Sequence, residues 1–246
     1  MENRQFLDRD RPLLGRIPGR DGIQLNEFVR EVTRLQLQAA AENLRKNQME
    51  AYLVSRKEDV VPLVRTLLRP GETVAVGGSE TLGETGVLDL LRSGEYRFLD
   101  RYASGISPDQ VRQVFRDSFS ADTYICSSNA VTMRGELYNV DGNGNRVAAL
   151  CYGPASVIVV AGRNKLVPDL DAAVARVKSM AAPANALRLT KETFCARTGR
   201  CLALDGEYCT DGCASPGRIC STYVVQGYQQ IANRIKVILV EEDLGL

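Results

Sequence analysis

Short apolar runs alternate with longer amphipathic segments along most of this chain, and this alternation restricts the fold more than any other feature. Strands are expected at residues 50–55, 73–78, 96–100, 156–162 and 234–245, with a further strand starting at 121, and helices at 25–48, 59–68, 82–92, 107–119 and 168–181. Such alternation predicts an α/β fold with a mostly parallel, twisted sheet between helices. Residues 136–152 are expected to form a hairpin around "DGNGN", which would be a small antiparallel insertion.

The chain is expected to contain one α/β domain over residues 25–246, preceded by a surface segment at 1–24 that is rich in Arg, Asp, Pro and Gly. A total of 246 residues is sufficient to bury a sizeable core in one such domain. Residues 195–220 are rich in Cys and Gly and show little periodicity. Because an apolar strand follows at 234–245, this part is interpreted as an insertion tied to the domain.

Charge and hydropathy argue against nucleic-acid and membrane partners. The 31 basic and 30 acidic residues leave a net charge of +1, too small for general attraction to polyanions. The N-terminus lacks the apolar stretch of a signal peptide, and the longest apolar run, residues 147–162, is interrupted by Gly153 and Pro154. We therefore expect a cytoplasmic protein without membrane insertion.

The absence of histidine limits the chemistry that this chain can perform. It excludes Ser-His-Asp and Cys-His catalysis and histidine-ligated zinc within the chain. Reactions must then depend on carboxylates, Lys, Arg, Tyr, hydroxyls, thiols or a bound cofactor. Since 25 of the 31 basic residues are Arg, clamps for carboxylate or phosphate are available.

The stretch "VAVGGSETLGE" predicts a strand followed by a glycine turn and a helix. Thr81 and Glu84 fit a capping box, with Thr81 as the N-cap. Gly77, Gly78 and Ser79 would then approach an anion closely at the end of the strand. A simple tight turn is the open alternative. The spacing matches neither a dinucleotide fingerprint nor a P-loop.

Polar side chains also follow two further predicted strands. Asn129, Thr132 and Glu136 supply an amide, a hydroxyl and a carboxylate, and Asn164 and Lys165 follow the strand at 156–162. These groups suit the binding and activation of a small oxygenated ligand, with Glu136 and Lys165 as the catalytic candidates. Ordinary loop chemistry, and a solvated lysine at a strand end, are the alternatives.

Five of the seven cysteines lie close together in the chain: Cys195, Cys201, Cys209, Cys213 and Cys220. In a cytosolic protein such a cluster suggests zinc or an iron–sulfur cluster before structural disulfides. No C-x-x-C pair occurs, so buried free thiols and disulfides stay open as alternatives.

Four segments together resemble the LUD domain, of the lactate-utilisation protein C type: "VAVGGSETLGETG", "SSNAVTMRGELYNVDGNGNRVAAL", "YGPASVIVVAGRNKLVPDLDAAVARV" and "GRICS…NRIKVILVEEDLG". The similarity runs from about residue 25 to the end. It implies a fold like that of the sugar-isomerase and coenzyme A transferase superfamily, with the site at the strand ends. The segment between Cys201 and Cys213 is expanded relative to the family and carries Cys209, which makes Cys209 the spare thiol and Cys195, Cys201, Cys213 and Cys220 the expected metal ligands.

The resemblance also implies a role in bacterial oxidation of lactate or a related 2-hydroxy acid, alongside an iron–sulfur protein. By position, Gly77, Gly78, Ser79 and Thr81 would face a cleft shared with Asn129, Thr132, Glu136, Asn164 and Lys165. The expected partners are a small anionic metabolite and an iron–sulfur oxidoreductase subunit, with a homodimer left open. A stand-alone isomerase or acyl-transferase type of enzyme, and a regulatory module that binds a small anion, are the alternatives.

Overall fold

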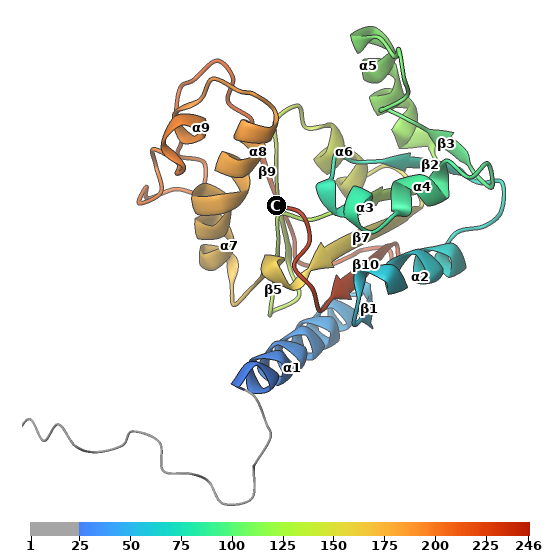
Figure 1. The fold of residues 1–246 in the computed structure, drawn as a ribbon, viewed down its shortest axis with the longest axis horizontal. Coiled ribbons are helices and arrows are strands. Elements are labelled where there is room, and N and C mark those ends of the chain that lie inside the picture. The colour runs from blue at the N-terminus through green and yellow to red at the C-terminus, as the bar shows by residue number, and fades with distance from the viewer. Residues whose placement is uncertain (1–24) are drawn as a thin grey trace, which may run out of the picture.

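A six-stranded sheet forms the centre of the protein, whose computed structural model describes residues 25–246. Its order is β1 (Glu50–Val54), β10 (Ile235–Val240), β7 (Ser156–Gly162), β4 (Thr123–Cys126), β2 (Thr73–Val76) and β3 (Arg97–Leu99). Figure 1 labels these strands except β4. All five pairings are parallel. The parallel α/β prediction is therefore confirmed, whereas the expected segment at 1–24 lies outside the described residues.

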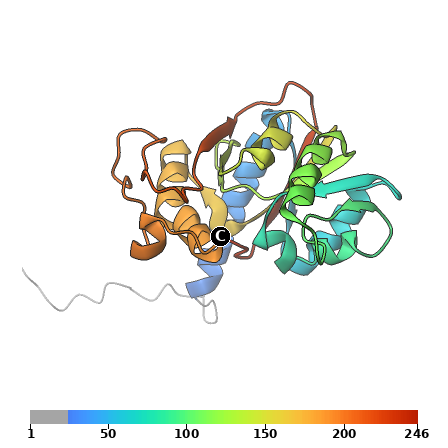
Figure 2. The same cartoon turned by 90° about the horizontal axis from the view of Figure 1, so that it is seen from above.

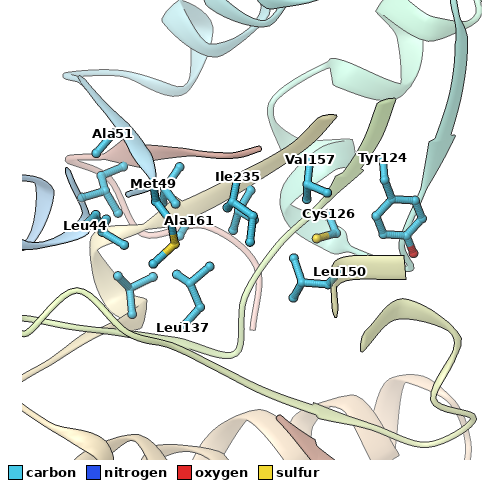
Figure 3. Close-up of a cluster of buried hydrophobic side chains, with 14 of the residues drawn as sticks. Leu44, Met49, Ala51, Tyr124, Cys126, Leu137, Leu150, Val157, Ala161 and Ile235 are labelled. Carbon is cyan, nitrogen blue, oxygen red and sulfur yellow. The ribbon is translucent and has the colours of Figure 1, made fainter. Parts of the chain in front are cut away.

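Helices cover both faces of this sheet, because its inner strands are apolar on both sides. In β7, Val157, Val159 and Ala161 belong to one core, which includes α1 (Leu25–Lys46) and α6 (Asn145–Cys151). Ile158 and Val160 belong to the second core, which includes α2 (Val60–Leu67), α3 (Glu80–Glu84) and α4 (Val87–Leu91). Figure 3 shows the first core. α5 (Pro108–Asp117) begins at the Ser-Pro pair expected from the sequence, with a capping box between Ser107 and Gln110.

A second, smaller sheet lies beside the carboxyl end of β7. Its order is β8 (Leu166–Val167), β5 (Ala130–Thr132), β6 (Leu137–Asp141) and β9 (Thr222–Gln226). β8 and β5 are parallel, and the other pairs are antiparallel. α7 (Leu170–Arg176) packs on this sheet and continues through one π-helical turn (Val177–Ala181) into α8 (Ala182–Arg188), which α9 (Phe194–Thr198) follows. In Figure 2 the orange α7–α9 group and the teal α3 region lie on opposite sides of the last residues.

Two sequence expectations about local structure are wrong. The 136–152 segment is not a hairpin: β6 ends at Asp141, and α6 follows Gly144, whose φ of 79° ends the extended run. β6 instead pairs with β5 and β9. The single helix expected at 82–92 is divided into α3 and α4 by Gly86, at φ 75°. Within residues 25–246, no helix is both long enough and apolar enough to span a bilayer.

Candidate functional site

A cleft of about 480 Å³ opens where three neighbouring strands of the large sheet end. Gly78 follows β2, Ser127 follows β4, and Lys165 lies in a short 3-10 turn (Arg163–Lys165) after β7. α8 and residues 216–219 contribute to the opposite wall. Ligand sites of open α/β sheets lie beyond the carboxyl ends of the strands, and this cleft has that position.

Lys165 is the most deeply placed amine of the cleft, with only 3% of its surface exposed. Its Nζ donates hydrogen bonds to Ser127 Oγ at 2.8 Å and to Thr81 Oγ1 at 2.9 Å. No carboxylate within residues 25–246 forms an ion pair with it. The Lys165 amine thus connects the turn after β7 with α3 and with the loop after β4, through the hydroxyl groups of Thr81 and Ser127.

Burial without a counter-ion changes the charge state of Lys165. The pKa of Lys165 is lowered from 10.5 to about 7, mainly by desolvation and further by the positive charges of Arg176 and Arg146. Glu84 and Cys126 oppose the shift. Near neutral pH a large fraction of Lys165 is therefore an uncharged amine, which is the form that acts as a base or nucleophile.

Arg146, from α6, is a second buried cation at the cleft, but its guanidinium is fully bonded. Its Nη1 donates to Asn139 Oδ1 at 2.6 Å and to the Ser127 carbonyl at 3.1 Å. Its Nη2 donates to Asn129 Oδ1 and the Val140 carbonyl, both at 2.8 Å. Asp141 adds an ion pair at 3.4 Å. Arg146 therefore connects the loop after β4 with β6.

The walls of the cleft are predominantly basic. Their basic side chains are Arg101, Arg146, Lys165, Arg188, Lys191 and Arg218, and their acidic side chains are Glu80 and Asp141. Arg188 pairs with Glu80 at 2.9 Å, whereas Arg101 stacks on Phe115 at 4.5 Å and has no carboxylate partner within residues 25–246. A surplus of positive charge in a hollow attracts anions.

The glycine loop after β2 reaches the cleft, but its predicted capping box is wrong. Ser79, not Thr81, is the N-cap of α3, and no side-chain cap bond forms. The Glu84 carboxylate instead accepts the backbone N–H of Gly245 at 2.8 Å. Gly78, Ser79 and Thr81 line the cleft, and the Ser79 hydroxyl oxygen is buried without a partner among the described residues.

Gly77 is placed differently from its neighbour Gly78. It does not line the cleft, and a Cβ there would meet Cys126 Cβ at 3.0 Å and Arg146 Cδ at 3.1 Å. Its role is therefore close packing of the loop on β4 and α6 rather than ligand contact.

The two candidate asparagines bind the protein itself. Asn129 lines the cleft, but its Oδ1 accepts from Arg146 and from the Val140 N–H. Asn164 Oδ1 accepts from the Leu244 N–H at 3.1 Å, and its Nδ2 lies 3.3 Å from the carbonyl oxygens of Leu244 and Gly245. Asn164 thus holds the closing segment of the chain beside Lys165.

Thr132 and Glu136 do not line the cleft. They lie on either side of the β5–β6 turn, where Thr132 Oγ1 donates to Glu136 Oε2 at 2.6 Å. The turn contacts Asn43 in α1 and Asn47 just after α1, and a Cβ at Gly135 would lie 2.5 Å from the Asn43 backbone. The structure therefore does not bring Glu136 together with Lys165 in one site.

The cysteines of residues 195–220 are all unpaired. Cys195, Cys201 and Cys213 are buried, Cys220 is partly buried and Cys209 is exposed. In residues 25–246 no three potential metal ligands are grouped to hold an ion. Burial raises the pKa of the Cys213 thiol, but hydrogen bonds with Ser215 and the Phe194 backbone outweigh this and lower it overall. The metal-site hypothesis gains no support from this arrangement.

The sequence reasoning missed the functional candidates Ser127 and Arg101 and the structural cation Arg146. Ser127 directly follows the buried strand β4, and that position was an available signal. Arg146 follows "DGNGN", a pattern that predicts a hairpin turn. The run Arg-Val-Ala-Ala-Leu contains good helix formers and could have indicated α6.

A family model for the LUD domain matches residues 37–240. The chain belongs to the LUD-domain family. A solved DUF162 family protein from Deinococcus radiodurans is similar at 14% identity, covering 86% of this chain and 98% of that chain, with a TM-score of 0.41. No curated protein matches the sequence significantly. All three strand-end loops of the cleft lie inside the span matched by the LUD model.

Proposed function

We propose that this LUD-domain protein binds a small carboxylate, of the 2-hydroxy-acid type, in the basic cleft as part of 2-hydroxy-acid oxidation. The observation that carries the proposal is a group of three basic side chains at the cleft, Arg101, Lys191 and Arg218, that form no ion pair with a carboxylate side chain among residues 25–246. Ser79, Ser127 and Thr81 add hydroxyl groups, which suit a ligand that carries both a carboxylate and a hydroxyl.

Arg101 is the cation best placed to recognise the carboxylate. Its guanidinium is oriented by stacking on Phe115 and Tyr102, and no carboxylate among residues 25–246 neutralises it. A planar guanidinium can form two parallel hydrogen bonds with a carboxylate, an arrangement that a lysine ammonium does not provide.

Titration calorimetry with L-lactate, D-lactate, glycolate and uncharged lactamide tests the proposal. We expect the three acids to bind and lactamide not to bind. Arg101→Gln should weaken acid binding by about 10-fold or more, because a charge-assisted hydrogen bond contributes about 1.5–3 kcal/mol. Arg112→Gln is the matched control, since Arg112 pairs with Asp109 on α5. Equal binding of lactamide, or no effect at Arg101, would contradict the proposal.

The oxidative role rests on family membership and requires a second protein. Conversion of a 2-hydroxy acid to a 2-oxo acid releases two electrons and two protons, and we propose an iron–sulfur oxidoreductase as the electron acceptor. Affinity purification from native cells without oxygen, followed by lactate-dependent dye reduction with each co-purified protein, tests this role. Dye reduction that is unchanged when this chain is omitted would contradict it.

A further inference from the structure

Binding an anion does not by itself account for the amine at the base of the cleft. A permanently charged guanidinium without a carboxylate partner, such as that of Arg101, would serve that purpose. Lys165 instead has two hydroxyl partners and no carboxylate among the described residues. The positive charge of a Lys165 ammonium group is therefore stabilised by only two neutral hydroxyl groups.

The groups around Lys165 come from four elements and are mostly unfavourable to a positive charge. Arg146 lies on α6 and Arg176 on α7, where Arg176 donates to the backbone carbonyls of Asn164 and Asn129 at 2.8 and 2.7 Å. Glu84 on α3 and Cys126 on β4 act in the opposite direction, but the Glu84 carboxylate is engaged by the Gly245 N–H. Burial and the positive charges of Arg176 and Arg146 therefore favour the neutral amine, which is the nucleophilic form of lysine.

We infer that Lys165 is a Schiff-base lysine, whose Nζ adds to the carbonyl carbon of a small 2-oxo acid held in the basic cleft. The inference rests on the carboxylate-binding cleft of the proposed function and assigns that cleft a covalent step. Arg101 and Lys191 line the same hollow and are available to the carboxylate of the 2-oxo acid.

The step needs no oxidant or reductant. The lone pair of the neutral Nζ forms the carbon–nitrogen bond, the carbonyl oxygen takes up a proton, and Nζ gives one up, which yields a carbinolamine. The hydroxyl group then leaves as water with one further proton, so that amine and ketone give imine and water. Ser127 and Thr81, each within 2.9 Å of Nζ, are positioned to pass these protons.

Reductive trapping tests the inference on the complete chain. The protein is incubated with pyruvate or glyoxylate and sodium cyanoborohydride, and intact mass and peptide mapping locate the adduct. We expect one adduct per chain, on Lys165, in the wild type and none in Lys165→Met. Ser127→Ala should slow trapping by roughly 10²-fold, because proton transfer by a positioned group contributes at least that factor.

Two other lysines provide internal controls. Lys178 is also buried, but its Nζ donates to the Tyr208 carbonyl and lies outside the cleft, while Lys191 lines the cleft nearer its surface. Trapping that is absent at Lys165, or no faster there than at Lys178 and Lys191, would overturn the inference. The wild-type map gives this answer even if Lys165→Met does not fold.

L-Lactate has no carbonyl group other than its carboxylate, so its binding is independent of imine formation. Lactate binding by calorimetry without pyruvate trapping would overturn the Schiff base and leave the proposed function intact. Pyruvate trapping without lactate binding would overturn the proposed function and retain the lysine chemistry.

Discussion

Lys165 and Arg146 are both buried cations at the same cleft, and they differ in how completely the protein surrounds them. Arg146 donates to four oxygen acceptors through its two Nη atoms and pairs with Asp141. Lys165 has two hydroxyl partners, and burial lowers its pKa. A basic side chain whose donors are all hydrogen-bonded stabilises the fold. One with few hydrogen-bond partners is available to react.

The largest expected effect is on stability, from removal of the Arg146 guanidinium. Arg146→Met should lower the free energy of unfolding by about 3–5 kcal/mol, because Asp141 and Asn139 would then be buried without their partner. Urea denaturation measures this, with the exposed α5 residue in Arg112→Met as the control. A loss under about 1 kcal/mol would show that Arg146 is not the structural member of the pair.

Removal of the Lys165 amine, in contrast, should change stability by an amount that depends on pH. The folded state releases the Lys165 proton near pH 7, whereas the unfolded chain keeps it up to about pH 10.5. Wild-type stability relative to Lys165→Met should therefore rise by about 1.4 kcal/mol per pH unit above pH 7, or about 2–3 kcal/mol by pH 9. Denaturation of both proteins at pH 7, 8 and 9 checks this, and a difference independent of pH would indicate an ordinary charged lysine.

The neighbouring glycines Gly77 and Gly78 extend the comparison to the loop. Gly77→Ala should destabilise the protein by about 1–2 kcal/mol, because its Cβ would press on Cys126 and Arg146. Gly78→Ala should leave stability within about 0.5 kcal/mol, since its Cβ would approach only the end of the Arg101 side chain, 3.3 Å away, and no backbone atom. Thermal unfolding and acid binding of both variants separate the roles, and equal unfolding temperatures would remove the distinction.

The smallest effect is expected at Glu136. An amide oxygen in Glu136→Gln can still accept the Thr132 hydroxyl, so stability should change by less than about 0.5 kcal/mol. Binding and trapping should also stay within about 2-fold of the wild type, because Glu136 does not line the cleft. If the rate of any turnover fell by about 10² or more, Glu136 would be a catalytic group despite its position.

Sequence patterns predict the large sheet well because each of its inner strands is recognisable from its own run of apolar residues. β7 and β10 are almost entirely apolar, and the helices between strands have clear boundaries such as Ser107-Pro108. The residues of the cleft are harder to predict. The end of each strand can be located from its own sequence, but the partners of a side chain depend on the three-dimensional fold. Gly78, Ser79, Thr81, Asn129 and Lys165 line the cleft, whereas Gly77, Thr132, Glu136 and Asn164 do not, and a binding role for any of them stays a prediction.

The failures came from residues whose partners lie far away in the chain. Glu84 has the spacing of a capping box, but its carboxylate binds the Gly245 N–H, 161 residues later. Asn164 likewise binds Leu244 and Gly245 rather than facing the cleft. Local spacing carries no information about such contacts. It therefore cannot distinguish a residue that caps a helix from one that binds a distant segment of the chain.

The order of the large sheet has a consequence for how the protein is made. β1 pairs only with β10, and β10 also separates β1 from β7. During synthesis, β1 and one edge of β7 must therefore wait for residues 235–240 to leave the ribosome before they gain a partner. Exposed strand edges of this kind invite pairing with other chains, and pairings between distant segments form slowly. Expression at lower temperature, or with chaperones, should accordingly raise the yield of folded protein more than it would for a sheet whose strands pair in order of synthesis.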